Sequence, residues 1–258
     1  MKVGTFPLGR GFPTLWRVIA TIKGKVRRLI DQFGGVSPIV MIVLLIVTLG
    51  AWAFIKIADE VVEGESQHID ETVLKSLRDP NDLSRPRGPA WLEEVMRDFT
   101  ALGSVTVLFL TVAAVVGYLW MVKKYAAMAL VVAATAGGLA VGSVLKYFFA
   151  RPRPSVVPHL AGVMTASFPS GHSMYSAIVY LTLGSLLARL APDWHVKIYF
   201  IIVALVLIVL VGISRVYLGV HYPTDVLAGW TAGLVWALVC WLAARYLQRK
   251  RIVEKDTE

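Results

Sequence analysis

The sequence predicts an all-α membrane protein in which six transmembrane helices form one bundle. Apolar residues make up 57% of its 258 residues, whereas Asp, Glu, Lys and Arg together make up only 17%. This composition is typical of multi-spanning membrane proteins and argues against a soluble domain. About 20 apolar residues in a helix cross a hydrocarbon layer about 30 Å thick. Six runs approach that length: 38–58, 101–122, 125–149, 172–190, 197–213 and 225–246.

A single membrane domain follows from these runs, because no internal repeat or low-complexity linker divides them. Residues 1–37 form a basic N-terminal segment, in which apolar residues recur at steps of three and four and predict an amphipathic interfacial helix. Residues 38–247 form the six-helix domain, with a loop at 59–99 between its first two helices. Residues 248–258 form a basic tail.

The charged residues orient the predicted helices. The segments on the side of the two termini hold 16 basic and five acidic residues, whereas the 59–99 loop holds 11 acidic and five basic residues. Because basic segments stay in the cytoplasm during insertion, we expect both termini inside and the acidic loop outside the cytoplasmic (inner) membrane. The net charge of +9 then sets topology and holds anionic lipid headgroups. It predicts the bilayer as a partner and no nucleic acid.

Two segments of the outer loop, HIDETVLKSLRD and PAWLEEVMRDF, carry apolar residues at helical spacing, and Pro89 suits a first helical turn. They would either lie on the outer leaflet and wall a substrate entrance, or form a solvated connection. The AWA at 51–53 resembles a signal-peptidase site, but the run continues past it, which argues against cleavage. The single cysteine, Cys240, permits no intrachain disulfide.

Ionisable side chains gather at the outer ends of the predicted helices. Lys146, Arg151 and Arg153 close the third helix, His172 opens the fourth, Arg215 closes the fifth, and His221 and Asp225 open the sixth. Charges at such depths are costly and are usually functional when they converge. Taken alone, Lys146 would be a snorkelling residue and Ser170 a helix N-cap. Lys56 has no partner in this pattern and is interpreted as snorkelling.

The convergent residues suit the chemistry of a phosphoryl group. Arginine and lysine bind phosphate oxygens, and the amides that begin the fourth helix, around Ser170 and Gly171, favour an anion. His221 lies four residues before Asp225, whose carboxylate would fix the imidazole tautomer and leave the other nitrogen free to attack. His172 has no neighbouring carboxylate in the sequence and suits protonation of a leaving oxygen, followed by activation of water.

Three motifs together resemble the signature of the type-2 phosphatidic-acid phosphatase superfamily. They are KYFFARPRP at 146–154, PSGH at 169–172 and SRVYLGVHYPTD at 214–225, and the resemblance covers about residues 100–247. It implies that Lys146, Arg153, Ser170, Gly171 and Arg215 bind phosphate. It also implies that His221 becomes a phosphohistidine, that Asp225 orients it, and that His172 is the general acid and base. No metal and no cofactor are implied. Arg151 is extra to the pattern and is expected only to contact headgroups.

The resemblance implies a metal-independent lipid phosphatase whose site faces the periplasm or exterior. Among the substrates of small bacterial members, we expect undecaprenyl pyrophosphate, returned to the monophosphate that carries peptidoglycan precursors. The alternatives are phosphatidylglycerophosphate, phosphatidic acid or lipid A phosphate, or a lipid phosphotransferase that uses the same site. A transporter or flippase is disfavoured, because it would need ionisable groups at several depths. No obligate protein partner is expected.

Overall fold

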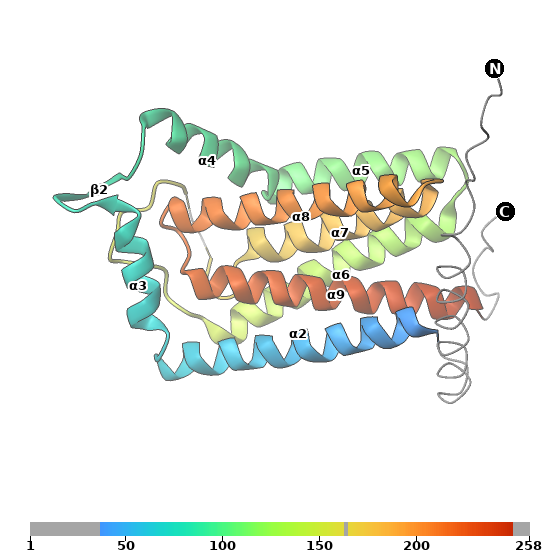
Figure 1. Ribbon diagram of the computed structural model, residues 1–258, viewed down its shortest axis with the longest axis horizontal. Coiled ribbons are helices and arrows are strands. Elements are labelled where there is room, and N and C mark those ends of the chain that lie inside the picture. Colours follow the sequence, from blue (N-terminus) through green and yellow to red (C-terminus); the bar gives the residue numbers. More distant parts are fainter. Residues whose placement is uncertain (1–36, 163–164, 250–258) are drawn as a thin grey trace, which may run out of the picture. The chain divides into compact units, whose positions relative to one another are not determined.

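The structure, a computed structural model, describes residues 37–162 and 165–249 (Figure 1). The predicted amphipathic helix and most of the basic tail lie outside these residues. The described elements, labelled as in Figure 1, are α2 Pro38–Glu63, α3 Gln67–Ser76, β1 Arg78–Asp79, β2 Asp82–Pro86, α4 Ala90–Leu102, α5 Val105–Met121, α6 Tyr125–Phe149, α7 Gly171–Leu190, α8 Trp194–Tyr217 and α9 Pro223–Arg249.

Within the described residues, five helices are long and apolar enough to cross a membrane: α2, α6, α7, α8 and α9. A sixth span is present if α4 and α5, which are bent by 47° against each other, are taken as one. The bend has a local cause, because Ser104 is extended and its side chain accepts a hydrogen bond from the Val107 amide, which starts a new helix. The predicted run at 101–122 therefore contains a break at Gly103. The chain is a multi-pass helical membrane protein.

Helix α7 is the centre of the packing and contacts α5, α6, α8 and α9. Its contact with α9 is close because α9 presents glycines to it. A Cβ on Gly229 would lie 2.6 Å from the Ser170 carbonyl oxygen, and one on Gly233 would lie 2.6 Å from the Met174 carbonyl oxygen. Small residues allow such an approach of helix backbones in lipid. The start of α7 is therefore held directly against the first turns of α9.

The segment between α2 and α5 packs on the ends of α8 and α9, as Figure 1 shows for α3 and α4. Helix α3 buries Asp70 and Leu74 completely. Between α3 and α4, the strands β1 and β2 pair antiparallel in a hairpin, which was not predicted from the sequence. The predicted HIDETVLKSLRD helix ends at Ser76, and Pro89 is the N-cap of α4. The loop therefore contacts the bundle through α3 and α4, and its role as the wall of a substrate entrance stays a prediction.

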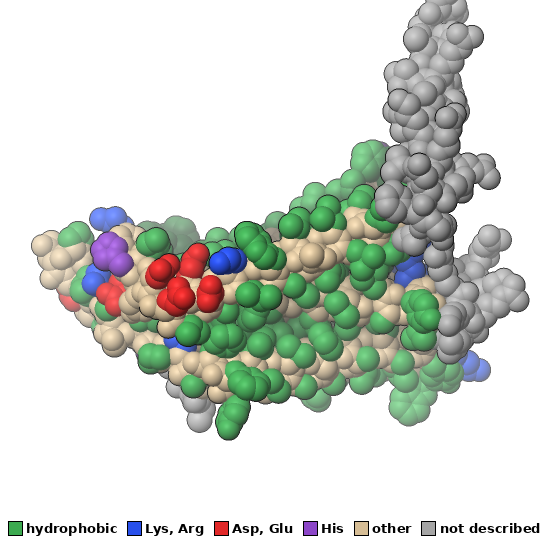
Figure 2. Space-filling model, turned by 90° about the horizontal axis from the view of Figure 1, so that it is seen from below, with side chains coloured by type: hydrophobic (Ala, Val, Ile, Leu, Met, Phe, Trp, Pro, Cys, Tyr) green, Lys and Arg blue, Asp and Glu red, His purple; other side chains and the backbone are tan. Residues whose placement is uncertain are grey.

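The visible surface is divided between apolar and charged side chains. Figure 2 shows hydrophobic side chains over much of the bundle and acidic ones gathered near the end that carries α3. Exposed acidic residues occur at the α2–α3 junction, namely Asp59, Glu60, Glu63 and Glu65. Exposed Lys56, expected to snorkel and to have no partner among the convergent residues, lies 3.7 Å from the exposed Asp59. The extent of exposed apolar surface fits a bilayer-facing band.

Candidate functional site

The junction between α8 and α9 turns sharply and buries His221. The Gly219 amide donates to the Val216 carbonyl and the Val220 amide to the Arg215 carbonyl, at 2.9 and 3.2 Å, which closes the end of α8. This pair of bonds is a Schellman motif, and it needs a left-handed residue after the helix. Gly219 supplies it with a φ of +71°. His221 follows two residues later and is only 1% exposed.

His221 and Asp225 lie together, as their spacing predicted. The His221 Nδ1 atom is 3.3 Å from Asp225 Oδ2. The same carboxylate oxygen accepts a hydrogen bond from the Tyr222 amide at 3.0 Å and another from the Ser167 hydroxyl. Asp225 is fully buried in the first turn of α9. Its carboxylate is thus held on one edge of the imidazole.

The other edge of the imidazole faces Arg153. The Arg153 NH1 atom is 3.3 Å from His221 Nε2 and also donates to the Val220 carbonyl at 2.7 Å. The Arg153 Nε atom donates to the Thr165 carbonyl at 2.7 Å, which fixes the guanidinium in place. Burial is the main cause that lowers the pKa of His221 to about 4, aided by repulsion from Arg153 and Arg215 and opposed by Asp225. Burial also lowers the pKa of Arg153.

Three cations from separate parts of the chain meet beside this histidine. Lys146, Arg153 and Arg215 interact electrostatically with one another. The Lys146 Nζ atom donates to the Ala166 carbonyl at 2.6 Å, and Arg215 NH1 donates to the Thr100 hydroxyl at 2.8 Å. Among residues 37–162 and 165–249, none of the three pairs with a carboxylate, and the buried Arg215 Nε has no hydrogen-bond partner. Such a cluster suits an anion with several oxygens.

The start of α7 lies in the same cluster. Ser170 is its N-cap, and the Ser170 amide donates to the Asp225 carbonyl at 2.9 Å, which ties α7 to α9. The Ser170 side chain makes no capping bond and instead accepts from the Ser173 hydroxyl at 3.0 Å. His172, the second residue of α7, interacts electrostatically with the three cations and with His221. The structure therefore brings together every residue that the sequence assigned to the site.

Arg151 is placed differently from its expected role as a headgroup contact, which is wrong. It is only 9% exposed and donates to Asp225 Oδ1 at 2.7 Å and to Asp70 Oδ2 at 3.0 Å. Asp70 and Ser167 also belong to this environment and were missed. Ser167 precedes the PSGH motif by two residues, which is a weak local signal. Asp70 has none, because it lies 81 residues from Arg151.

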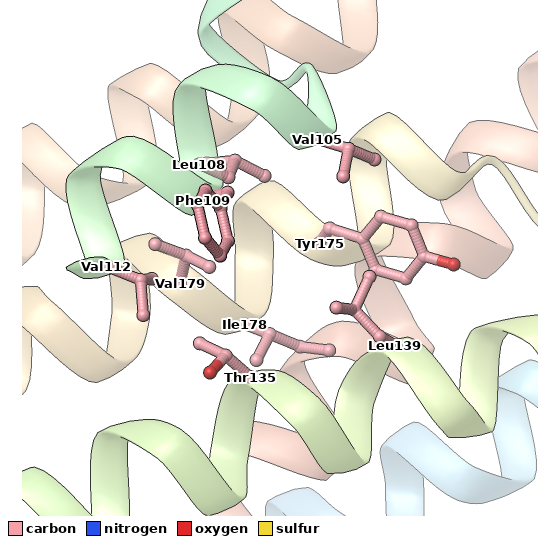
Figure 3. Close-up of a pocket in the computed structure, with 9 residues that line it drawn as sticks. All are labelled: Val105, Leu108, Phe109, Val112, Thr135, Leu139, Tyr175, Ile178 and Val179. Atoms are coloured by element: carbon pink, nitrogen blue, oxygen red, sulfur yellow. The ribbon is translucent and has the colours of Figure 1, made fainter.

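An apolar pocket adjoins the site between α5, α6 and α7. Figure 3 shows its lining: Val105, Leu108, Phe109, Val112, Thr135, Leu139, Tyr175, Ile178 and Val179. Its volume is about 100 Å³. Ile178 is buried, whereas Val105 and Phe109 are 55% and 68% exposed, so the pocket has a rim on the bundle surface.

The pocket approaches the cation cluster at Tyr175. This residue is three positions after His172 on α7, and a Cβ on Gly171 would lie 3.2 Å from the Tyr175 ring and 3.4 Å from Lys146 Cε. The apolar pocket and the polar site are therefore about one helical turn apart.

Comparisons with known proteins agree with this architecture. Residues 125–249 match the model of a family described as the PAP2 superfamily. The chain is 35% identical over 187 residues to phosphatidylglycerophosphatase B of Bacillus subtilis (strain 168), covering 70% of this chain and 86% of that protein. It is 35% identical over 100 residues to an undecaprenyl-diphosphatase of Sulfolobus acidocaldarius, covering 37% and 44% respectively.

A solved structure is similar as well. The crystal structure of the first transmembrane PAP2 type phosphatidylglycerolphosphate phosphatase from Bacillus subtilis aligns with a TM-score of 0.71 at 31% identity. The alignment covers 79% of this chain and 98% of that one. All of the motif residues from Lys146 to Asp225 fall within the family match.

Proposed function

The chain belongs to the PAP2 superfamily and is a membrane lipid phosphatase, and we propose that it acts through a phosphohistidine formed on His221. The observation that carries this mechanism is the contact between Arg153 NH1 and His221 Nε2 at 3.3 Å. An arginine can only donate, so Nε2 carries the lone pair and Nδ1 carries the proton that faces Asp225. The lone pair therefore points to the guanidinium that would hold the phosphate.

In the first step, His221 Nε2 attacks the terminal phosphorus atom, and the bond from that phosphorus to the leaving oxygen breaks, while His172 gives a proton to this oxygen. The leaving oxygen is the bridging oxygen in a pyrophosphate and the ester oxygen in a lipid monophosphate. In the second step, water attacks the phosphorus atom, His172 takes the proton of this water, and the P–N bond breaks to release inorganic phosphate. His172 is thereby returned to its starting protonation state.

The three cations stabilise the charge of both transition states. Lys146, Arg153 and Arg215 would each face an oxygen of the transferring group, and the Ser170 side chain and Gly171 amide would add donors at the positive end of α7. Support comes from the absence of carboxylate partners for these three cations in the described part of the chain. An incoming phosphate would supply the negative charge that they lack.

The substrate that we propose first is undecaprenyl pyrophosphate, cleaved to the monophosphate at the outer face of the cytoplasmic membrane. The apolar pocket beside Tyr175 would take the first units of the lipid chain, which enters from the bilayer past Val105 and Phe109. Phosphatidylglycerophosphate is the second candidate, because the relative of which this chain covers 86% is named phosphatidylglycerophosphatase B. A phosphotransferase would form the same phosphohistidine and differ only in the acceptor.

Phosphate release from a panel of lipid phosphates tests this proposal. The panel holds undecaprenyl pyrophosphate, phosphatidylglycerophosphate, phosphatidic acid and lipid A phosphate, presented in detergent and in liposomes. We expect wild type to release phosphate, with the highest kcat/KM on undecaprenyl pyrophosphate, and His221→Ala and His172→Ala to be inactive. His195→Ala is the matched control, since His195 is exposed in the first turn of α8. Full activity of His221→Ala would overturn the mechanism, and a higher kcat/KM on another lipid would overturn the substrate.

A further inference from the structure

Arg151 connects the Asp225 carboxylate to a second buried carboxylate on α3. Its NH1 atom is 2.7 Å from Asp225 Oδ1, and its NH2 atom is 3.0 Å from Asp70 Oδ2. Both carboxylates are 0% exposed. The arginine uses its two terminal nitrogens for different partners, so a single guanidinium bridges α3 and the first turn of α9. Helix α3 lies across that end of the bundle in Figure 1 and contacts α9.

The arginine is enclosed by further contacts from α3, from α9 and from Tyr222, which directly precedes α9. Thr224 accepts from Arg151 NH1 at 2.9 Å, and its amide donates to Asp70 Oδ1 at 3.1 Å. Its hydroxyl also donates to Asp70 Oδ2. Gln67 accepts from Arg151 NH2 at 3.3 Å, and the guanidinium carbon lies 4.2 Å from the centre of the Tyr222 ring. Residues of α3 and of the first turn of α9 therefore hold both terminal nitrogens of Arg151.

The two oxygens of Asp225 have separate roles in this arrangement. Oδ1 faces Arg151, whereas Oδ2 faces His221, Ser167 and the Tyr222 amide. If Arg151 were absent, Oδ1 would be buried without its ionic partner, which is costly for a carboxylate. The carboxylate would then rotate or move toward another cation, and Oδ2 would leave the imidazole edge.

We propose that Arg151 and Asp70 are positioning residues for phosphoryl transfer. Together they hold the Asp225 carboxylate so that its Oδ2 stays on His221 Nδ1, and α3 thereby sets the orientation of the nucleophile. This inference rests on the proposed role of His221. Asp70 acts through Arg151, whose guanidinium it keeps on the side of Asp225 Oδ1. Neither residue contacts the phosphate, which the cations Lys146, Arg153 and Arg215 bind.

Two conservative variants test the bridge. Asp70→Asn keeps the size of the side chain and an acceptor for the Thr224 amide but removes the charge, and Arg151→Lys keeps the charge but removes the fork. We expect each to lower kcat by about 10- to 100-fold, the loss typical of a slightly misplaced reacting group. KM and the inhibition constant of inorganic phosphate should change less than about twofold, because neither variant alters the phosphate-binding residues Lys146, Arg153 and Arg215. The double variant should lose little more than either single variant, since the two residues act as one unit.

Matched controls come from the hairpin. Asp82 and Arg85 form an ion pair at 3.4 Å whose side chains are exposed, and Asp82→Asn and Arg85→Lys should keep wild-type kcat. If Asp70→Asn does not fold, a second pair of variants, both at Thr224, tests the same contact between Arg151 and Asp70. Thr224→Ser keeps the hydroxyl that touches both Asp70 and Arg151, whereas Thr224→Val removes it and should lower kcat with KM unchanged.

Three results would overturn the inference. The first is a wild-type kcat in both Asp70→Asn and Arg151→Lys. The second is a loss of activity that appears as an equal rise in KM and in the inhibition constant of inorganic phosphate. The third is a loss in the double variant equal to the sum of the two single losses in activation free energy. His221→Ala, measured in the same series, separates the two proposals. If that variant keeps its activity, the phosphohistidine mechanism fails, whereas an inactive His221→Ala beside a fully active Asp70→Asn refutes only the role of the bridge.

Discussion

Arg153 and His221 lie with NH1 and Nε2 3.3 Å apart, so a cation occupies the edge of the imidazole opposite Asp225. This relationship assigns the tautomer, because arginine has no acceptor to offer and Nε2 must present its lone pair. It also places the free edge of the proposed nucleophile at the group that would bind the phosphate.

Replacing Asp225 with Asn removes the acceptor that selects the Nδ1 proton. The asparagine amide can donate to Nδ1, which would move the proton to Nε2 and block attack. We expect Asp225→Asn to lower kcat by roughly 10³- to 10⁴-fold, as for a histidine held in the wrong tautomer. Phosphate release measures the loss, and thermal unfolding of the purified protein shows that the variant is folded. A loss of less than about tenfold would contradict the assigned tautomer.

The pH profile of kcat/KM should reflect the buried state of His221. Burial lowers the pKa of His221 to about 4. The ring therefore stays neutral and nucleophilic at pH values below the ordinary pKa of a histidine. Activity due to this group is therefore present above about pH 5 and is lost as the pH falls through 4. Arg153→Ala removes a repelling charge and should raise this pKa, so the acid limb should move to higher pH. Wild type and Arg153→Ala are measured with the same substrate, so that titration of the substrate phosphate affects both profiles equally. An unmoved limb would argue against His221 as the titrating group.

The close packing of α9 on the start of α7 predicts a specific sensitivity to size. A methyl group at Gly229 would lie 2.6 Å from the Ser170 carbonyl oxygen and 3.0 Å from Ser173 Cβ. Gly229→Ala should therefore destabilise the protein by about 1–3 kcal/mol and lower kcat by displacing His172. Gly117→Ala on α5 is the control, because a Cβ there meets nothing within 4 Å. Thermal unfolding and phosphate release would compare the two, and equal stability of both variants would refute the prediction.

Filling the apolar pocket should affect lipid substrates selectively. Val179→Phe places a larger side chain in the pocket between α5 and α7. We expect it to raise KM for long-chain lipid phosphates and to leave hydrolysis of a short, water-soluble phosphate ester unchanged. Leu110→Phe, at an exposed position of α5 outside the pocket lining, is the matched control. An equal effect on both classes of substrate would mean that the pocket does not receive the chain.

Chelation of divalent metals should leave the activity unchanged. The proposed phosphate-binding site already holds the positive charges of Lys146, Arg153 and Arg215, which repel a further cation. The measurement is phosphate release before and after treatment with EDTA, followed by addition of Mg²⁺. Loss of activity on chelation that Mg²⁺ restores would require a different account of transition-state stabilisation.

The local features of the site were predictable because they depend on short spacings. His221 and Asp225 are four residues apart at a helix start, and Ser170 directly precedes α7, so helix geometry alone brings them near their positions. The detail of the Ser170 cap was not predictable, since its side chain accepts from the Ser173 hydroxyl and makes no capping bond to a helix amide. Competition between two short polar contacts decides such a cap, and both are compatible with the sequence.

The sequence by itself determined the membrane class, the approximate helices and the three motifs, because the length of an apolar run and the spacing of polar residues are local properties. Only the tertiary structure decided the bend between α4 and α5, the β1–β2 hairpin and the contact of Asp70 with Arg151. That contact joins residues 81 positions apart. It exists because α3 packs on the first turn of α9, and no periodicity in either segment encodes which buried carboxylate will meet which arginine.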